Sequence, residues 1–146
     1  MSIKAQLIAI VLSTMTQLSP APLVDREQAY CLAKNIYHEA RSEPIEDQIM
    51  VATVTLNMAA KMGRSVCQEV YWPKRYSWTH APADYRVVRE PEAWSKAVEI
   101  AVLKLSGDSL GDTSLADHFY EYKKVRPHWA RSMETVRKGD WLVFSV

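Results

Sequence analysis

Apolar residues recur at three- and four-residue steps in two early segments of the chain. In the first segment, residues 28–41, they are Ala29, Leu32, Ala33, Ile36 and Ala40. This spacing turns one face of an α-helix toward a core. Asp25 stands just before it and is expected to be the N-cap, with Gln28 as its capping-box partner. The pattern therefore predicts an amphipathic helix at the start of the folded domain.

A second segment, from about Glu46 to Met62, has the same periodicity. Its predicted buried stripe consists of Ile45, Ile49, Ala52, Leu56 and Ala59. Pro44 separates this segment from the first helix, and Gly63 is placed to end it. The two helices are expected to form a hairpin, with Glu39 and Glu43 near its tip.

Two further helices are predicted by their end signals. Ser65 is expected to cap a short helix over residues 66–70. Pro91 is expected to begin a helix that runs to Leu105 and is closed by Gly107. Between them, residues 71–86 are rich in aromatic residues and prolines, which predicts an ordered but irregular loop.

The C-terminal third has a β-like pattern. Residues 118–122 and 141–146 read as strands, and a short helix is expected between them, around residues 129–137. The chain is therefore predicted to have an α+β fold, mostly helical with a small antiparallel β element.

Residues 1–24 have the composition of a targeting segment. Lys4 is followed by no charged residue until Asp25, and residues 7–12 are continuously apolar. A cleaved signal peptide, a releasable membrane anchor and an ordinary packed amphipathic helix all fit this pattern. We expect the first 24 residues to serve export or membrane association, and residues 25–146 to form the folded domain.

Composition excludes several classes of function. Lys and Arg total 18 and Asp and Glu total 17, so the net charge of +1 does not indicate a nucleic-acid-binding protein. There is no Gly-rich phosphate loop and no internal repeat. Cys31 and Cys67 lack the CxxC spacing of zinc or redox sites. In an oxidising compartment they can pair as a disulfide, and otherwise they are two buried thiols.

Glu39 is the residue with the clearest chemical potential. With Ile36 at the centre of the apolar stripe, a turn of about 100° per residue places Glu39 about 60° to one side. Partial loss of water disfavours a charged carboxylate there and raises its pKa. A carboxylic acid that keeps its proton near neutral pH can act as a general acid. The alternative is a solvated or ion-paired surface glutamate.

Several segments, taken together, resemble one enzyme family. They are residues 32–41, 48–57, 66–71, 76–79, 116–120 and 125–130. In this order they are similar to the SleB/CwlJ-type cell-wall hydrolases, which include spore-cortex-lytic enzymes and phage and bacterial muramidases. The resemblance extends over roughly residues 30–144, and its most specific motifs are Asn-Ile-Tyr-His-Glu-Ala-Arg and Ser-Trp-Thr. The chain departs from the family at Ser42 and Leu115, where Gly is usual, and at Tyr120, where a second His is common.

The resemblance implies a fold like that of lysozymes and lytic transglycosylases. It implies a peptidoglycan-degrading enzyme that cleaves between N-acetylmuramic acid and N-acetylglucosamine, with Glu39 as the catalytic acid. A single acid suits a lytic transglycosylase, in which the substrate's own hydroxyl attacks. A muramidase-type hydrolase would use a second carboxylate. The candidates for that carboxylate are Glu43, Asp84, Asp108, Asp112 and Asp117.

Candidate substrate-binding residues are aromatic or polar side chains in the matching segments. They are Tyr37, Arg41, Glu43, Tyr76, Ser77, Trp78, Thr79, His118 and Tyr120. Their rings could stack on sugar faces and their polar groups could bind hydroxyl or acetamido groups. For each aromatic residue the alternative is core packing, and for His118 it is a structural role.

Three other functions have to be distinguished from this one. A zinc peptidase is disfavoured because Ser42 stands where the second His of a His-Glu-x-x-His motif is needed. A cysteine amidase is disfavoured because Cys31 belongs to a helix interior. A non-catalytic glycan-binding module would need the aromatic residues but not Glu39. We therefore expect a monomeric enzyme without cofactor or metal, exported to the periplasm or cell wall by a bacterium or released to it by a phage. Its partners would be peptidoglycan strands and, transiently, the inner membrane, but no nucleic acid.

Overall fold

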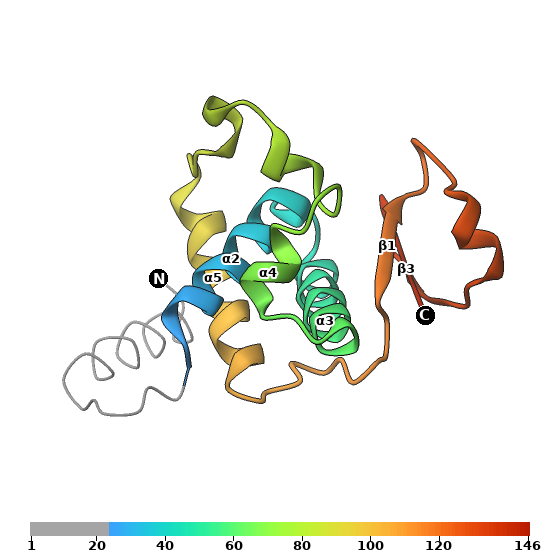
Figure 1. Cartoon of the computed structure of the whole chain (residues 1–146), viewed down its shortest axis with the longest axis horizontal. Coiled ribbons are helices and arrows are strands. Elements are labelled where there is room, and N and C mark those ends of the chain that lie inside the picture. Colours follow the sequence, from blue (N-terminus) through green and yellow to red (C-terminus); the bar gives the residue numbers. More distant parts are fainter. Residues whose placement is uncertain (1–23) are drawn as a thin grey trace.

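The computed structural model describes residues 24–146, so residues 1–23 of the predicted targeting segment lie outside the described residues. The described chain is mostly helical with a small antiparallel sheet, which confirms the predicted α+β class (Figure 1). Its α-helices and strands are α2 (Arg26–Ala40), α3 (Ile45–Met62), α4 (Val66–Val70), α5 (Pro91–Leu105), β1 (His118–Glu121), β2 (Thr135–Lys138) and β3 (Leu142–Ser145). Among these residues, no helix is both long and apolar enough to cross a membrane.

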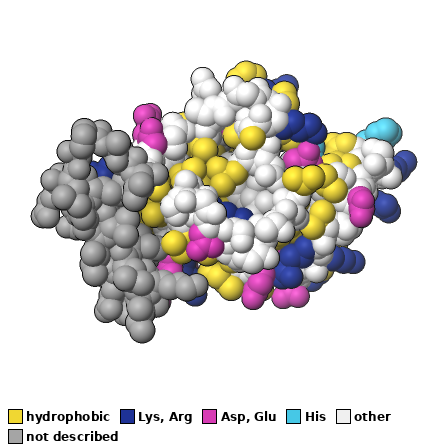
Figure 2. Space-filling view, turned by 90° about the horizontal axis from the view of Figure 1, so that it is seen from below, with side chains coloured by type: hydrophobic (Ala, Val, Ile, Leu, Met, Phe, Trp, Pro, Cys, Tyr) yellow, Lys and Arg dark blue, Asp and Glu magenta, His cyan; other side chains and the backbone are white. Residues whose placement is uncertain are grey.

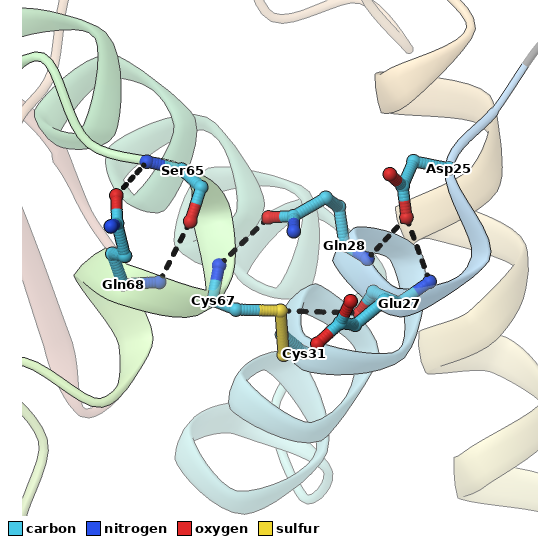
Figure 3. The surroundings of a disulfide bond; sticks show 7 residues. All are labelled: Asp25, Glu27, Gln28, Cys31, Ser65, Cys67 and Gln68. Carbon is cyan, nitrogen blue, oxygen red and sulfur yellow. Dashed lines mark hydrogen bonds between the residues drawn. A yellow bond between two sulfur atoms is a disulfide. The ribbon is translucent and has the colours of Figure 1, made fainter.

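Helix α2 is the centre of the helical body. It packs against α3, α4 and α5 (Figure 1), and every member of its predicted apolar stripe is buried. Asp25 is its N-cap, as predicted, because its Oδ1 accepts hydrogen bonds from the backbone N–H groups of Glu27 (2.9 Å) and Gln28 (3.2 Å). The predicted capping box is wrong. Gln28 Oε1 instead accepts from the backbone N–H of Cys67 at 2.9 Å, because the first turn of α4 presents an unpaired donor beside it (Figure 3).

A disulfide joins α2 to α4. Cys31 and Cys67 are bonded, with their Cα atoms 5.2 Å apart (Figure 3). Ser65 and Gln68 form a full capping box at the start of α4, so this five-residue helix is held by its cap and by the cross-link. Of the two alternatives left open by the sequence, the structure contains the paired form. By loop closure such a bond stabilises the fold by about 3–4 kcal/mol.

Helix α3 has the predicted bounds but a different buried surface. Ile45 is exposed, and Ile49 and Leu56 are only partly buried. The most deeply buried apolar side chains are those of Met50, Val51, Ala52, Val54, Met58 and Ala59. The predicted stripe faces the core except at Ile45, but it is too narrow, because α3 contacts α2, α4, α5, β1 and β3 and several of its sides are covered. Gly63 ends the helix in the left-handed conformation (φ 64°), as predicted.

The C-terminal residues form a three-stranded sheet of order β1-β3-β2. Its strands β1 and β3 lie beside α3 (Figure 1). Strands β1 and β3 confirm the two predicted β runs, and His118 pairs with Ser145. The helix predicted around residues 129–137 is wrong in its second half. A 3-10 helix spans His128–Ser132, and the chain then forms β2 because its backbone groups pair with β3. The predicted irregular loop contains two 3-10 helices, Ser77–His80 and Ala83–Arg86.

One buried ion pair ties this sheet to the helical body. Arg137 Nε on β2 lies 2.7 Å from Asp47 Oδ1 in the first turn of α3, and Asp47 is fully buried. The backbone of Gly139 passes so close to the Asp47 carboxylate that a Cβ atom would not fit there. On the face seen in Figure 2, Lys and Arg side chains are interspersed with Asp and Glu, in keeping with the balanced net charge.

Candidate active site

A cleft of about 830 Å³ lies between the helical body and the sheet. Its walls come from the end of α2, the middle of α3, residues 74–80, strand β1 and residues 124–129. The cleft therefore combines elements from distant parts of the chain. Glu39 is the α2 residue that lines it.

Glu39 is partly buried at the last turn of α2. Within residues 24–146 its carboxylate has no hydrogen bond and no ion pair. Burial, followed by the negative charge of Glu121, raises the pKa of Glu39 to about 7. Near neutral pH both the protonated and the ionised forms of this group are populated, so it can donate and accept a proton at the same site.

Glu121 is a second cleft carboxylate that the sequence interpretation missed. It ends β1 and forms an ion pair with Lys124, at 2.7 Å between Oε2 and Nζ. The alternation of side chains along a strand could have predicted its place, because residues two positions apart lie on the same face. Phe119 packs against the core rings of Tyr76 and Phe144, and Glu121, two residues on, belongs to the same strand face.

Asp117 is the one proposed second carboxylate that the structure brings into the cleft; the cleft lining does not include Glu43, Asp84, Asp108 or Asp112. His118 Nδ1 donates to Asp117 Oδ1 at 2.9 Å, and Lys61 Nζ donates to its Oδ2 at 3.0 Å. Burial acts to raise the pKa of Asp117, but these two partners hold it below its usual value. Asp117 is therefore an ionised group that orients the His118 ring within the cleft.

The predicted substrate-binding residues divide into two groups. Tyr76, Ser77, His118 and Tyr120 line the cleft, whereas Tyr37, Arg41, Glu43, Trp78 and Thr79 do not. Tyr76 is only 6% exposed and packs on Phe119, so its ring contributes to the wall rather than standing free.

The residues outside the cleft have structural contacts that explain their placement. The Tyr37 hydroxyl accepts from the backbone N–H groups of Arg89 (3.0 Å) and Glu90 (3.2 Å). Arg41 Nε lies 2.6 Å from Glu90 Oε2. Thr79 Oγ1 donates to the carbonyl of Tyr76 at 2.7 Å. The motif around Glu39 therefore joins the α2 end to the chain that leads into α5.

Trp78 belongs to the core, which is the alternative that the sequence left open for each aromatic residue. It is 7% exposed and stacks on His38 with ring centroids 4.4 Å apart. Its Nε1 donates to Oδ1 of the fully buried Asn35 at 2.8 Å. The aromatic loop folds inward here because this hydrogen bond satisfies a buried polar side chain.

Trp129 is the aromatic surface that the sequence interpretation overlooked. It is 37% exposed, lines the cleft and contacts His118 and Tyr120. Trp129 could have been predicted as a site residue from its position in the segment 125–130, which carries part of the family resemblance. In residues 24–146, no group of three or more His, Cys, Asp or Glu side chains is arranged to hold a metal ion.

Comparison with protein families shows which family the chain matches. Residues 42–144, more than half of the chain, match the family model described as Cell Wall Hydrolase. The matched span includes the sheet up to Phe144, Glu121 and residues 74–80, and it begins three positions after Glu39. Searches of the curated proteins and of the solved structures give no match.

Proposed function

This chain belongs to the cell wall hydrolase family, and from that premise we propose that it cleaves the glycan backbone of peptidoglycan with Glu39 as general acid and base. The bond would be the one between N-acetylmuramic acid and N-acetylglucosamine. The family supports an enzyme that acts on the cell wall. The observation that carries the role of Glu39 is its carboxyl group in the cleft, with a pKa raised to about 7.

The mechanism that we propose needs one proton carrier. Protonated Glu39 gives its proton to the glycosidic oxygen as the bond from that oxygen to the muramic acid C1 breaks. The resulting oxocarbenium-like centre is attacked by a hydroxyl of the same sugar, and the Glu39 carboxylate takes the proton of that hydroxyl. The new ether bond leaves an anhydro end, which is the product of a lytic transglycosylase, and Glu39 ends in its starting form.

A muramidase-type hydrolase is the second candidate, and Glu121 is the observation that favours it. Glu121 lines the same cleft and its charge contributes to the raised pKa of Glu39. In a hydrolase it would act as the nucleophile or as the base that activates water. We favour the transglycosylase because Glu121 is already ion-paired with Lys124.

Mass spectrometry of the released muropeptides tests both the function and the choice between these mechanisms. Anhydro-muramic ends from purified sacculi would support the transglycosylase, and reducing muramic ends would establish the hydrolase in its place. If Glu121→Gln protein also lost all turnover, the single-acid mechanism would be wrong. Absence of any glycan product from the wild-type protein would refute glycan cleavage altogether.

The activity is expected to fall as the pH rises through about 7, because Glu39 must hold a proton when the leaving oxygen departs. Above that pH the rate at limiting substrate should drop by about tenfold per pH unit. Initial rates measured from pH 5 to pH 9 at constant ionic strength check this.

Glu121→Gln provides the control for the pH profile. Removing this negative charge should move the midpoint to lower pH, since the charge helps to raise the pKa of Glu39. An alkaline limb whose midpoint is the same in both proteins would show that another group titrates.

For substrate contacts we propose the cleft residues Tyr76, Ser77, His118, Tyr120 and Trp129, acting in a monomer without cofactor. For location we propose export to the periplasm or cell wall, with transient contact to the inner membrane through residues 1–24. The Cys31–Cys67 disulfide supports this, because such bonds form and persist in oxidising compartments.

Deleting residues 2–24 is expected to leave the lytic activity of the purified protein unchanged and to abolish lysis from within an expressing cell. The reason is that the helix bearing Glu39 begins with its own cap at Asp25. Turbidity of purified sacculi and of the expressing culture are the two measurements. An insoluble or inactive truncated protein would show instead that the segment packs on the domain.

A further inference from the structure

One wall of the cleft carries positive charge that its own carboxylates do not neutralise. Glu69 is fully buried behind this wall, and it faces two guanidinium groups. Arg64 Nη1 lies 2.8 Å from its Oε2, and Arg75 Nε lies 2.7 Å from its Oε1. One negative charge thus holds two positive ones, and the cluster keeps a net charge of +1.

Arg75 is the member of this cluster that faces the cleft. Its side chain is 28% exposed and lines the cleft, whereas that of Arg64 is 14% exposed and stacks over Trp72. In the described part of the chain its ion pair uses Nε, which leaves the two terminal nitrogens of the guanidinium for another partner. A carboxylate matches the geometry of such a fixed fork.

Lys74 adds a second positive charge beside Arg75. It is exposed, lines the cleft, and forms no ion pair within residues 24–146. Its backbone has the left-handed conformation (φ 62°), which is unfavourable for a residue other than Gly. The backbone N–H of Lys74 donates to Nε2 of His80 at 3.2 Å, so the turn that places Lys74 at the cleft is held by a neighbour from the same wall.

The acids of the cleft do not neutralise these two cations. Asp117 is bound by Lys61 and His118, and Glu121 is bound by Lys124. Glu39, with its raised pKa, carries only part of a negative charge near pH 7. A negatively charged ligand can therefore meet Lys74 and the two terminal nitrogens of Arg75 without displacing a carboxylate of the cleft.

We infer that Lys74 and Arg75 form a carboxylate-binding subsite that holds the peptide stem of the glycan strand. This rests on the proposed function, because the stem carboxylates are the anions that a peptidoglycan strand brings into the cleft beside the sugar that is cut. The subsite makes the enzyme specific for glycan whose peptides retain free carboxylates.

The test is a double comparison of enzyme charge and substrate charge. Soluble, uncrosslinked glycan strands with peptide stems are assayed in two forms, native and with their carboxylates converted to neutral amides. Lys74→Gln should lower kcat/KM on native strands by about 5- to 10-fold, mainly through KM, and change it by less than about twofold on amidated strands. Wild-type protein should lose a similar factor when the native strands are replaced by amidated ones.

Arg75→Gln is the second variant, and it leaves the buried Glu69 still paired with Arg64. Its melting temperature is recorded beside its kinetics, because Arg75 also contributes an ion pair to the wall of the cleft. It should show the same selective loss on native strands as Lys74→Gln. Lys96→Gln, at an exposed position of α5 outside the cleft, is the control for a general loss of positive charge.

The outcomes separate the subsite from the proposed function. Equal losses on native and amidated strands, or the same loss in Lys96→Gln, would overturn the subsite while leaving glycan cleavage in place. If wild-type protein cleaves neither form, the proposed function fails and the subsite fails with it.

Discussion

Replacing Glu39 by Gln is expected to reduce turnover of peptidoglycan by about 10²- to 10⁴-fold, the usual contribution of a positioned general acid or base. Glutamine has nearly the same shape and keeps the polar contact surface, but it cannot give up a proton to the leaving oxygen. The remaining rate would come from substrate positioning by the rest of the cleft.

The fold of this variant should be intact. Burial raises the pKa of Glu39, so its ionised form is disfavoured in the folded state. The stability that the protonated group contributes is complete below the pKa of the unfolded chain and is lost as the pH rises through about 7. Above that pH, Glu39→Gln protein should therefore melt at the same temperature as wild type or at a higher one.

Turbidity clearing of sacculi and circular dichroism on the same samples measure the two effects. Glu27→Gln is the matched control, because Glu27 is exposed and lies in the first turn of the same helix. That variant should keep activity within about twofold, as surface substitutions usually change stability by less than ~0.5 kcal/mol. Near-normal turnover by Glu39→Gln protein would refute the assignment of Glu39.

Replacing Trp78 by Ala is expected to lower the free energy of unfolding by about 3–5 kcal/mol. The indole is 7% exposed, stacks on His38 and contacts Tyr71 edge-on. Its loss leaves a cavity and removes the donor that satisfies Oδ1 of the fully buried Asn35. The melting temperature should fall by more than ~10 °C.

Urea unfolding with the disulfide intact measures this loss, and two further variants divide it. Trp78→Phe keeps an aromatic ring but loses the N–H, so it isolates the hydrogen bond to Asn35. Trp72→Ala is the control from the same loop, because Trp72 is 45% exposed and its described ring contact is with Arg64. That change should cost about 1 kcal/mol or less. A stable Trp78→Ala protein with weakened glycan binding would contradict this prediction and would show that Trp78 binds substrate.

Local sequence signals predicted the elements that depend on neighbouring residues. Asp25 and Ser65 are caps, Pro91 begins a helix and Gly63 ends one, as expected, because each acts within one turn of its own backbone. The predicted stripe of α2 is buried throughout, but Cys31, Asn35 and Tyr37 outside it are buried as well, because three helices pack against α2. For α3 the predicted stripe was too narrow, since neighbours cover more than one side of the helix.

Glu39 could be singled out from the sequence, because its position at the edge of the α2 stripe and its motif both pointed to it. The sequence could not predict which residues share the cleft with Glu39. Glu121 and Trp129 reach the cleft only after β1 pairs with β3 and the sheet docks beside α3. Strand pairing and docking depend on contacts between residues far apart in the chain, which no local pattern records.

The aromatic loop shows the same division. Its composition predicted an ordered, irregular segment, and the structure has one. Tertiary contacts decide the direction of each side chain. Trp78 points into the core, where it donates a hydrogen bond to Asn35, and Arg75 lies at the cleft wall, where it pairs with Glu69. A buried polar group needs its partner. The residue that supplies it is determined by the packing of the helices, and so the sequence alone indicated the chemistry of Glu39 whereas the tertiary structure decided which side chains surround it.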